Sequence, residues 1–273
     1  MNKLVFLDID GTLTVPGSNV PPQSALDAIR AAQRKGHKVF LCTGRNLAML
    51  SPLLKYGFDG VVGSAGGYVE CGGKVIYDLP MSDSQRDTAL SLLHADGVFC
   101  TIEAKDATYG DDDLGDFLNQ TEGGNSEIQR WRAALAGELG IRPMWEYDGR
   151  PIYKVVFMCQ QESQLAAAKA ALEADFNFCT QTITEPACLN GELINRNFDK
   201  GRGIARLCEY LGIDVSDTYG FGDSMNDLEM IQTVGTSVVM ENGNETLKAM
   251  ADYICPCVEA DGIATAFQKL NLI

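Results

Sequence analysis

The stretch LVFLDIDGT, residues 4–12, carries an apolar segment directly into two aspartates that are one residue apart. The apolar part, residues 4–7, has no polar face, which is typical of a central strand in a parallel sheet. Ligands of open parallel sheets bind beyond the carboxyl ends of the strands. Asp8 and Asp10 therefore stand where such a sheet would place a ligand site.

Strand-like and helix-like segments alternate before and after a long middle region. Before it, we expect strands at residues 4–7 and 38–42 and a third short strand within 59–67, with helices at 24–36 and 46–56. After it, helical patterns at 200–211, 225–232 and 244–251 alternate with short apolar strands. This alternation predicts an α/β fold with a doubly wound parallel-sheet, Rossmann-like core.

The middle region has helices and strands of its own. Helical patterns cover residues 84–95, 126–139 and 162–174, and strand patterns cover 98–103, 107–110, 152–159 and 177–183. We therefore expect an inserted α/β domain at residues 82–189, with a core made of residues 1–81 and 190–273.

The composition disfavours some classes of binding partner. Lys and Arg number 22 against 37 Asp and Glu, a net charge of −15, which repels nucleic-acid phosphates and anionic membranes. The nine cysteines are scattered, and their odd number favours reduced thiols over a disulfide framework. No apolar run resembles a signal peptide or a membrane span. We expect a cytoplasmic protein without nucleic-acid or membrane partners, and the composition leaves the oligomeric state open.

Further polar groups follow other predicted strands of the core. Thr43 follows the apolar segment KVFLC, Asp223 follows TYGF, and Lys200 opens a predicted helix. Any one of these residues alone would be explained as a helix cap or a turn residue. Because the carboxyl ends of parallel strands meet at one edge of the sheet, together they indicate a site.

The acidic residues of this group predict a metal site. Asp8, Asp10 and Asp223, with Asp227 four residues further on, would form an oxygen-rich cluster. A few carboxylate ligands suit Mg²⁺, which keeps part of its water shell and binds substrate phosphate. Ca²⁺ is disfavoured, because the chain has no twelve-residue calcium-loop pattern.

Four segments carry a resemblance to a known family. DIDGTLT (8–14), CTGR (42–45), DKGRGIA (199–205) and GDSMND (222–227) resemble, in this order, the four motifs of the haloacid dehalogenase-like hydrolases. The long insertion between the second and third motifs resembles the Cof-like, type IIB group, whose inserted α/β domain is a substrate-selecting cap.

The resemblance implies roles for the polar residues at the predicted sheet edge. Asp8 would be the nucleophile that attacks phosphorus. Asp10 would be the general acid for the leaving alcohol and then the general base for the hydrolytic water. Thr43 and Lys200 would hold the phosphoryl oxygens, with the backbone amide of Gly44 close by.

The resemblance also implies the metal ligands. Asp223, the carboxylate of Asp8 and the backbone carbonyl of Asp10 would bind Mg²⁺. Asp227 would support the metal through water, and Asn226 would orient Lys200 or the substrate.

The expected function is an Mg²⁺-dependent phosphatase of small phosphorylated metabolites, sugar phosphates above all, that forms an aspartyl-phosphate. A sugar phosphomutase would need the same Asp8 and Asp10, so the motifs do not separate these two activities. A non-catalytic phospholigand-binding protein is a third possibility, although a pure binder has no need of Asp10.

Two features remain open at this stage. Ala65-Gly66 stands where relatives often carry Asn-Gly, so a substrate contact made by that asparagine would be missing here. Arg45 follows Thr43-Gly44 and could meet a substrate anion, although a place at a helix start or on the surface explains it equally well.

Overall fold

The computed structural model describes residues 2–115, 140–183 and 188–273. Its backbone divides into two compact units. The first unit contains residues 1–45, 50–78 and 198–273, and the second contains residues 46–49 and 79–197. The chain therefore passes between the units after residues 45, 49, 78 and 197. The predicted helix at 126–139 lies outside the described residues.

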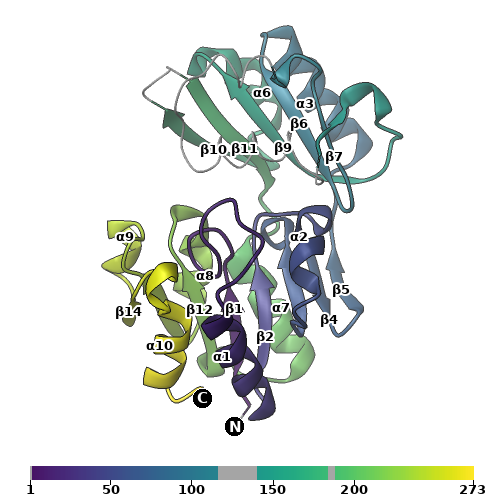
Figure 1. The fold of residues 1–273 in the computed structure, drawn as a ribbon. Coiled ribbons are helices and arrows are strands. Elements are labelled where there is room, and N and C mark those ends of the chain that lie inside the picture. Colours follow the sequence, from purple (N-terminus) through teal and green to yellow (C-terminus); the bar gives the residue numbers. More distant parts are fainter. Residues whose placement is uncertain (1, 116–139, 184–187) are drawn as a thin grey trace. The chain divides into compact units, whose positions relative to one another are not determined.

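The first unit is built on an eight-stranded sheet. Its strands are β1 (Leu4–Leu7), β2 (Lys38–Cys42), β3 (Gly60–Gly63), β4 (Tyr68–Cys71), β5 (Lys74–Asp78), β12 (Thr218–Gly222), β13 (Thr236–Met240) and β14 (Tyr253–Cys255). They lie in the order β14-β13-β12-β1-β2-β3-β4-β5 (Figure 1). The strands from β14 to β3 are parallel, and β4 and β5 add an antiparallel hairpin.

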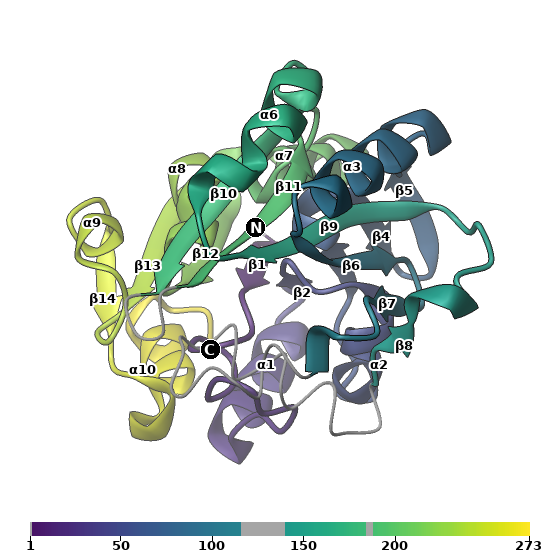
Figure 2. The ribbon, with the colours of Figure 1, turned by 90° about the horizontal axis from the view of Figure 1, so that it is seen from above.

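Helices cover both faces of this sheet. They are α1 (Gln23–Arg34), α2 (Leu47–Leu54), α7 (Lys200–Leu211), α8 (Leu228–Thr233), α9 (Glu245–Lys248) and α10 (Gly262–Lys269). Figure 2 shows α1 and α10 on one side of the central strands, and α7 and α8 on the other. This is a doubly wound α/β unit, which confirms the predicted fold class.

Strand β1 lies at the centre of the core. Every residue from Leu4 to Leu7 is fully buried, because each face of the strand packs against a helix layer. On one face, Phe6 stacks on Phe40 with ring centroids 5.3 Å apart, in a cluster that includes Ile204 of α7. Burial of each large apolar side chain contributes about 1.5–3 kcal/mol. The apolar core therefore fixes the point at which β1 ends and Asp8 begins.

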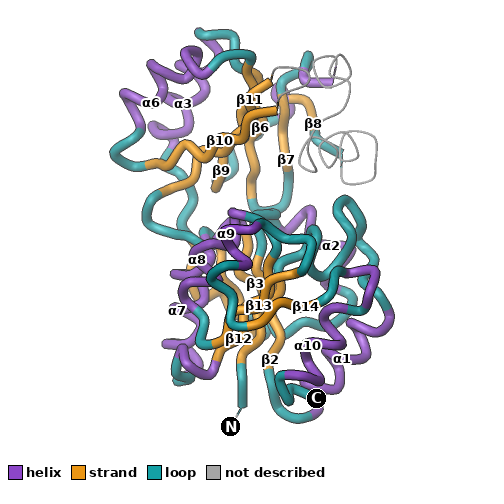
Figure 3. Tube along the Cα trace, turned by 90° about the vertical axis from the view of Figure 1, so that its left-hand side faces the viewer, coloured by secondary structure: helices purple, strands orange, loops and turns teal. Residues whose placement is uncertain are grey.

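The second unit is built on a six-stranded sheet in the order β10-β11-β9-β6-β7-β8. Its strands are β6 (Phe99–Ala104), β7 (Thr108–Gly110), β8 (Arg142–Pro143), β9 (Ile152–Cys159), β10 (Phe176–Ile183) and β11 (Cys188–Asn195). Helices α3 (Asp83–Ala95) and α6 (Ala166–Leu172) pack on one face of this sheet (Figure 3). Between them lies a core that includes Leu93, Ile102, Phe157 and Phe176.

Strand β11 lies where the residue pattern predicted no strand. The expected boundary between residues 189 and 190 cuts through β11, whose residues pair with both β9 and β10. Asn190, Gly191 and Glu192 break the apolar pattern that a central strand normally shows. Gly191 is required there, because a Cβ atom would lie 2.5 Å from both the carbonyl oxygen of Cys179 and Cζ of Phe157.

Residues 46–49 group with the second unit because Asn46 is bonded into it. The fully buried Nδ2 of Asn46 lies 2.9 Å from the carbonyl oxygen of Ala104, 3.2 Å from that of Ala107 and 3.0 Å from Oγ1 of Thr108. Leu47 N also donates to the carbonyl oxygen of Lys105 at 2.9 Å. Within the second unit, these bonds hold residues 46 and 47 against the turn between β6 and β7.

Among the helices of the described residues, none is long and apolar enough to cross a membrane.

Candidate active site

Three carboxylates converge beyond the ends of β1 and β12. Asp8 follows β1, Asp223 follows β12, and Asp227 ends the short 3-10 turn Met225–Asp227. One oxygen from each carboxylate lies within 4.8 Å of the other two. Strands β1 and β12 are parallel neighbours, and Asp8 N extends their ladder by donating to the carbonyl oxygen of Phe221 at 3.0 Å. Sheet pairing therefore brings Asp8 and Asp223 to the same edge.

Lys200 supplies the positive charge of this cluster. It opens α7, is only 2% exposed, and places Nζ 2.7 Å from Oδ1 of Asp8 and 2.5 Å from Oδ1 of Asp227. Asn226 Oδ1 accepts a third, longer hydrogen bond from the same ammonium at 3.3 Å. A buried ammonium is tolerated only when it is paired, and here all three partners are oxygen atoms.

The charges of the cluster do not balance. Three carboxylates and one ammonium together carry a net charge of −2 when all are ionised. Burial and then the neighbouring Asp227 raise the pKa of Asp8 well above its ordinary value, although Lys200 opposes this. For Asp223, burial and then Asp227 raise the pKa to about 7. The site thus lacks positive charge in the amount that one divalent cation would supply.

The same excess of negative charge affects the pKa of Lys200. Burial alone would lower the pKa of its ammonium, but the charges of Asp227 and Asp8 outweigh burial and raise that pKa. Lys200 is therefore cationic at neutral pH.

The three carboxylates differ in how many of their oxygens already accept hydrogen bonds, and so in their capacity to bind a metal. Asp227 is fully engaged, because Oδ1 accepts from Lys200 and Oδ2 accepts from the backbone amides of Asp223 and Ser224 at 3.0 and 3.2 Å. Asp8 accepts from Lys200 through Oδ1, and Asp223 accepts from Thr12 Oγ1 through Oδ1 at 3.1 Å. Within the described part of the chain, no donor contacts Oδ2 of Asp8 or of Asp223. These two oxygens can therefore accept a divalent cation.

Gly11 allows Asp223 to approach the loop that follows β1. Its φ of +88° is unfavourable for other residues, and a Cβ atom would lie 2.5 Å from Oδ2 of Asp223. The loop turns immediately after β1, since Leu13 N and Thr14 N both donate to the carbonyl oxygen of Ile9. The glycine of this motif therefore leaves space for a carboxylate.

The predicted phosphate-binding residues occupy the same edge of the sheet. Thr43 directly follows β2, the neighbour of β1, and is buried. Its Oγ1 accepts a hydrogen bond from Arg45 N at 3.2 Å, and Gly44 lies between these two residues. Asn226 contacts Lys200, as described above. The roles of Thr43, Gly44 and Asn226 in phosphate binding stay predictions.

The carboxylate of Asp10 lies outside the cluster and pairs with Arg45. Arg45 Nε donates to Oδ2 of Asp10 at 2.9 Å, and Nη2 donates to Oδ1 at 2.7 Å. Gly17 N also donates to Oδ1 at 3.0 Å, and Arg45 Nη1 donates to Asn19 Oδ1 at 2.7 Å. The Arg45 side chain is only 4% exposed, so it is neither a surface group nor a free helix-start cation. Sequence reasoning missed this pair, because no periodicity links residues 35 positions apart.

The comparisons with known proteins identify the family. The family of haloacid dehalogenase-like hydrolases matches residues 5–267. This chain belongs to that family. The match confirms the resemblance that was predicted from the four motifs.

Relatives of this haloacid dehalogenase-like hydrolase match it over nearly its full length. YkrA of Bacillus subtilis (strain 168), named as a candidate phosphatase, is 30% identical over 278 residues, which cover 100% of this chain and 99% of YkrA. YwtE of the same organism, named 5-amino-6-(5-phospho-D-ribitylamino)uracil phosphatase, is 25% identical over 283 residues, covering 98% of each chain.

Solved structures share the fold of this haloacid dehalogenase-like hydrolase. A protein from Geobacillus kaustophilus HTA426 has a TM-score of 0.81 at 28% identity, covering 100% of both chains. BT4131, described as a subclass IIB sugar phosphatase, has a TM-score of 0.78 at 24% identity, again over 100% of both chains. The likeness to BT4131 is one of fold.

The loop after β3 carries Ala65-Gly66, where the motif resemblance led us to expect Asn-Gly. Ser64, Ala65 and Gly66 have φ values of 48°, 56° and 98°, all in the left-handed region. Ala65 N donates to the carbonyl oxygen of Thr43 at 3.0 Å, so the loop lies beside the predicted phosphate-binding residues. Asn and Gly adopt this region more readily than Ala, so Ala65 is strained.

A second group of metal-ligand types lies in the second unit. His94, Cys100 and Asp111 place one ligand atom each within 4.8 Å of one another. Asp111 is already engaged there, because its oxygens lie 3.1 Å from His94 Nε2 and one of them accepts from Cys100 N at 2.7 Å. These contacts explain the cluster without a metal ion.

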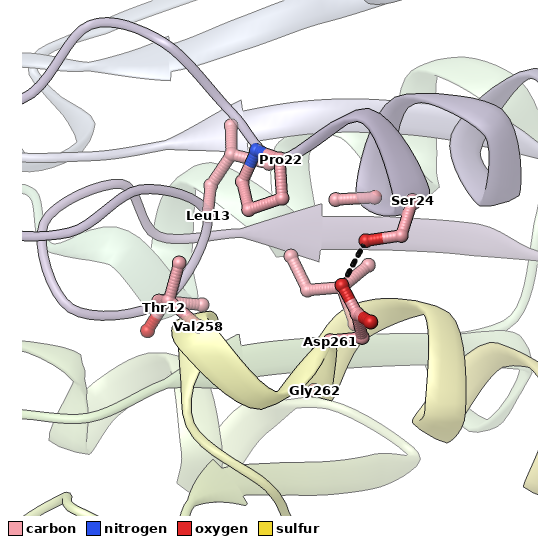
Figure 4. A pocket seen from close by; sticks show the side chains of 9 residues that line it. Thr12, Leu13, Pro22, Ser24, Val258, Asp261 and Gly262 are labelled. Atoms are coloured by element: carbon pink, nitrogen blue, oxygen red, sulfur yellow. Dashed lines mark hydrogen bonds between the residues drawn. The ribbon is translucent and has the colours of Figure 1, made fainter.

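A small pocket lies between the loop after β1 and the start of α10 (Figure 4). Most of its lining is apolar, and Ser24 Oγ donates a hydrogen bond to Oδ1 of Asp261. Of its lining residues only Thr12 touches the carboxylate cluster, through Asp223. None of the pocket's lining residues is among those predicted for the candidate active site.

Proposed function

We propose that this haloacid dehalogenase-like phosphatase hydrolyses small phosphorylated metabolites through an aspartyl-phosphate on Asp8, with Mg²⁺ as its cofactor. The observation that carries the proposal is the position of Asp8. Its carboxylate, 4% exposed, stands at the end of the central strand between Lys200 and Asp223. Sugar phosphates are the leading substrate class, since the fold is shared with a sugar phosphatase and YwtE is named for a phosphorylated ribityl compound.

In the first step, a carboxylate oxygen of Asp8 forms a bond to phosphorus while the bond from phosphorus to the substrate oxygen breaks. The electron pair of the broken bond stays on the leaving oxygen, which takes a proton from Asp10. Lys200 and Thr43 hold the phosphoryl oxygens in place. Mg²⁺ held by Asp8, Asp223 and the Asp10 carbonyl would neutralise negative charge on these oxygens.

In the second step, water attacks the phosphorus of the aspartyl-phosphate. Asp10 accepts the proton of this water, the bond between phosphorus and Asp8 breaks, and inorganic phosphate leaves. The carboxylate of Asp8 is regenerated, so the cycle consumes one ester and one water. Asp10 returns the accepted proton to the next leaving group.

The size of the barrier explains why several groups are needed. Acceleration of phosphate-monoester hydrolysis can approach about 10²¹-fold. One acid–base group typically supplies about 10²–10⁴-fold. Most of the effect must therefore come from positioning and from charge neutralisation of the phosphoryl oxygens.

We also propose a cellular location for the protein and a role for its second unit. We assign the protein to the cytoplasm, where thiols stay reduced, because its nine cysteines are scattered along the chain and odd in number. We assign the second unit, residues 46–49 and 79–197, the role of a substrate-selecting cap.

The direct test is phosphate release from a panel of phosphomonoesters, with and without Mg²⁺. We expect turnover of at least one sugar phosphate that depends on Mg²⁺. Folded protein that turns over no member of the panel would contradict the proposal. Conversion of a hexose 1-phosphate into the 6-phosphate without free phosphate would indicate a mutase instead.

Two variants separate the roles of the paired aspartates. Asp8→Asn should abolish turnover and weaken Mg²⁺ binding, because it removes both the attacking oxygen and a metal ligand. Asp10→Asn should lower turnover by about 10²–10⁴-fold and change Mg²⁺ binding less, because the backbone carbonyl remains. Full activity of Asp10→Asn would favour a non-catalytic role for that residue.

A further inference from the structure

One guanidinium group holds both ends of the segment from Asp10 to Asn19. Nε and Nη2 of Arg45 donate to the two carboxylate oxygens of Asp10, and Nη1 donates to Asn19. Two parallel charge-assisted bonds fix the orientation of a carboxylate as well as its distance. Arg45 therefore constrains the rotation of the Asp10 side chain, which a single hydrogen bond would leave open.

Arg45 is itself anchored to the sheet edge. Its backbone N donates to Thr43 Oγ1 at 3.2 Å, and its carbonyl oxygen accepts from Ser64 N at 3.0 Å. These contacts tie Arg45 to the ends of β2 and β3. Asp10, by contrast, lies in the loop after β1. The ion pair thus holds Asp10, a loop residue, to a residue that is bonded to the edge of the sheet.

We propose that Arg45 is a positioning residue for Asp10. The inference rests on the proposed function, in which Asp10 exchanges a proton with the leaving oxygen and then with water. Proton transfer needs heavy atoms about 2.6–3.2 Å apart. A displacement of about 1 Å can lower a rate by about 10²-fold. Arg45 keeps the Asp10 carboxylate within this tolerance.

Lysine cannot replace Arg45 in this role. A guanidinium presents a planar fork that matches both carboxylate oxygens, whereas an ammonium is a point charge on a flexible chain. Arg45→Lys keeps the charge beside Asp10 but loses the fixed orientation. The two substitutions, to Ala and to Lys, therefore separate positioning from charge.

The test compares leaving groups. A sugar phosphate has a poor leaving group that needs a proton, whereas p-nitrophenolate leaves without one. We expect Arg45→Ala and Arg45→Lys to slow turnover of a sugar phosphate by about 10–100-fold, with KM changed less than about twofold. Single-turnover release of p-nitrophenol should fall less than about threefold, because that step does not need the proton of Asp10. Arg30→Ala, at an exposed arginine of α1, is the matched control.

A second arm places Arg45→Ala in the Asp10→Asn background. If Arg45 acts through Asp10, the double variant should be no slower than Asp10→Asn alone, because the effects of coupled residues are not additive. Should Arg45→Ala fail to fold, Asn19→Ala removes only the outer contact and should show the same leaving-group pattern at smaller size.

The outcomes separate this inference from the proposed function. A wild-type protein without phosphatase activity, or an Asp10→Asn variant with full activity, contradicts the proposed function itself. If wild type is active and Asp10→Asn is impaired, equal losses on both substrates would overturn only the role of Arg45. A further loss in the double variant, or faster turnover by Arg45→Ala, would overturn it as well.

Discussion

The ammonium nitrogen of Lys200 lies 2.7 Å from Oδ1 of Asp8, and both groups are buried. Lys200 is thus the cation that separates the carboxylate of Asp8 from that of Asp227. Breaking a buried ion pair by removing one partner typically costs about 3–5 kcal/mol, because the other charge stays buried and uncompensated. The stability of the metal-free protein should therefore depend on this single lysine.

Lys200→Met should lower the free energy of unfolding by about 3–5 kcal/mol at pH 8 in the absence of divalent cations. At pH 5 the loss should be smaller, because the raised pKa of Asp8 allows it to take up a proton and lose its charge. Urea denaturation at both pH values measures the difference. Lys38→Met, which breaks the partly exposed pair with Asp59, is the control and should cost less than about 1 kcal/mol. Equal losses from the two substitutions would refute the argument.

Gly11→Ala should displace Asp223 and so weaken Mg²⁺ binding and turnover. The new Cβ atom would meet Oδ2 of Asp223 at 2.5 Å, which forces the carboxylate to move. The measurement is the rise in melting temperature on addition of Mg²⁺, which follows from binding to the native state. We expect this rise in wild type and a much smaller one in Gly11→Ala.

Gly17→Ala is the matched control for Gly11→Ala. Gly17 lies in the same loop and has a φ of +80°, but a Cβ atom there would have no neighbour within 4 Å. Both substitutions carry a backbone cost of about 1–2 kcal/mol for the left-handed conformation. Only Gly11→Ala should lose the effect of Mg²⁺, so the same loss in Gly17→Ala would count against the contact with Asp223.

His37 should make stability depend on pH below neutrality. Its Nδ1 accepts a hydrogen bond from Lys3 N at 3.0 Å, and burial, followed by Lys35 and Lys3, lowers its pKa. Below about 6.5 the unfolded chain therefore binds more protons at this residue than the native state does. The stabilising contribution of His37 should be complete above pH 6.5 and should disappear as pH falls through the native pKa.

Comparison of wild type with His37→Ala measures this contribution. We expect His37→Ala to cost about 1 kcal/mol at pH 7.5, the usual size of a hydrogen bond, and less at pH 5. Titration of the imidazole by NMR should give a pKa below 6.5, and Lys35→Met should raise it. A cost that stays constant from pH 7.5 to pH 5 would rule out the hydrogen bond to Lys3 as its source.

Ala65→Gly should stabilise the protein. Ala65 has a φ of 56°, where a residue with a Cβ atom pays about 1–2 kcal/mol relative to its favoured conformation. We expect a gain of about 1 kcal/mol in thermal or urea unfolding, since glycine removes this strain but has more entropy to lose. Ala31→Gly, inside helix α1, is the control and should lose about 1 kcal/mol.

The sequence predicts those parts of the site that strand ends determine. Asp8, Thr43 and Asp223 each follow an apolar strand of the parallel sheet, so local pattern and sheet geometry suffice to place them at one edge. Lys200 is less evident, since its contact with Asp8 depends on how α7 packs on the sheet. Its place at the start of a predicted helix drew attention to it, and the motif resemblance then implied its role.

Other contacts depend on loop paths that have no sequence period. The position of Arg45 beside Asp10 requires the loops after β1 and β2 to approach each other, and either surface exposure or substrate contact would fit the sequence equally well. Both carboxylate oxygens of Asp227 accept hydrogen bonds. This depends on a 3-10 turn that brings the carboxylate back to the backbone amides of Asp223 and Ser224. Strand β11 was missed because its polar residues resemble those of a loop.

The hydrogen bonds of the Asn46 side chain affect how domains can be exchanged between relatives. A chimera joined at residues 78/79 and 197/198 would import a foreign β6–β7 turn but keep the native Asn46. The buried amide of Asn46 would then face acceptors that did not evolve with it, and an unsatisfied buried group costs about 1–3 kcal/mol. The part of the chain to be exchanged is therefore discontinuous. Residues 46–49 must be exchanged together with residues 79–197.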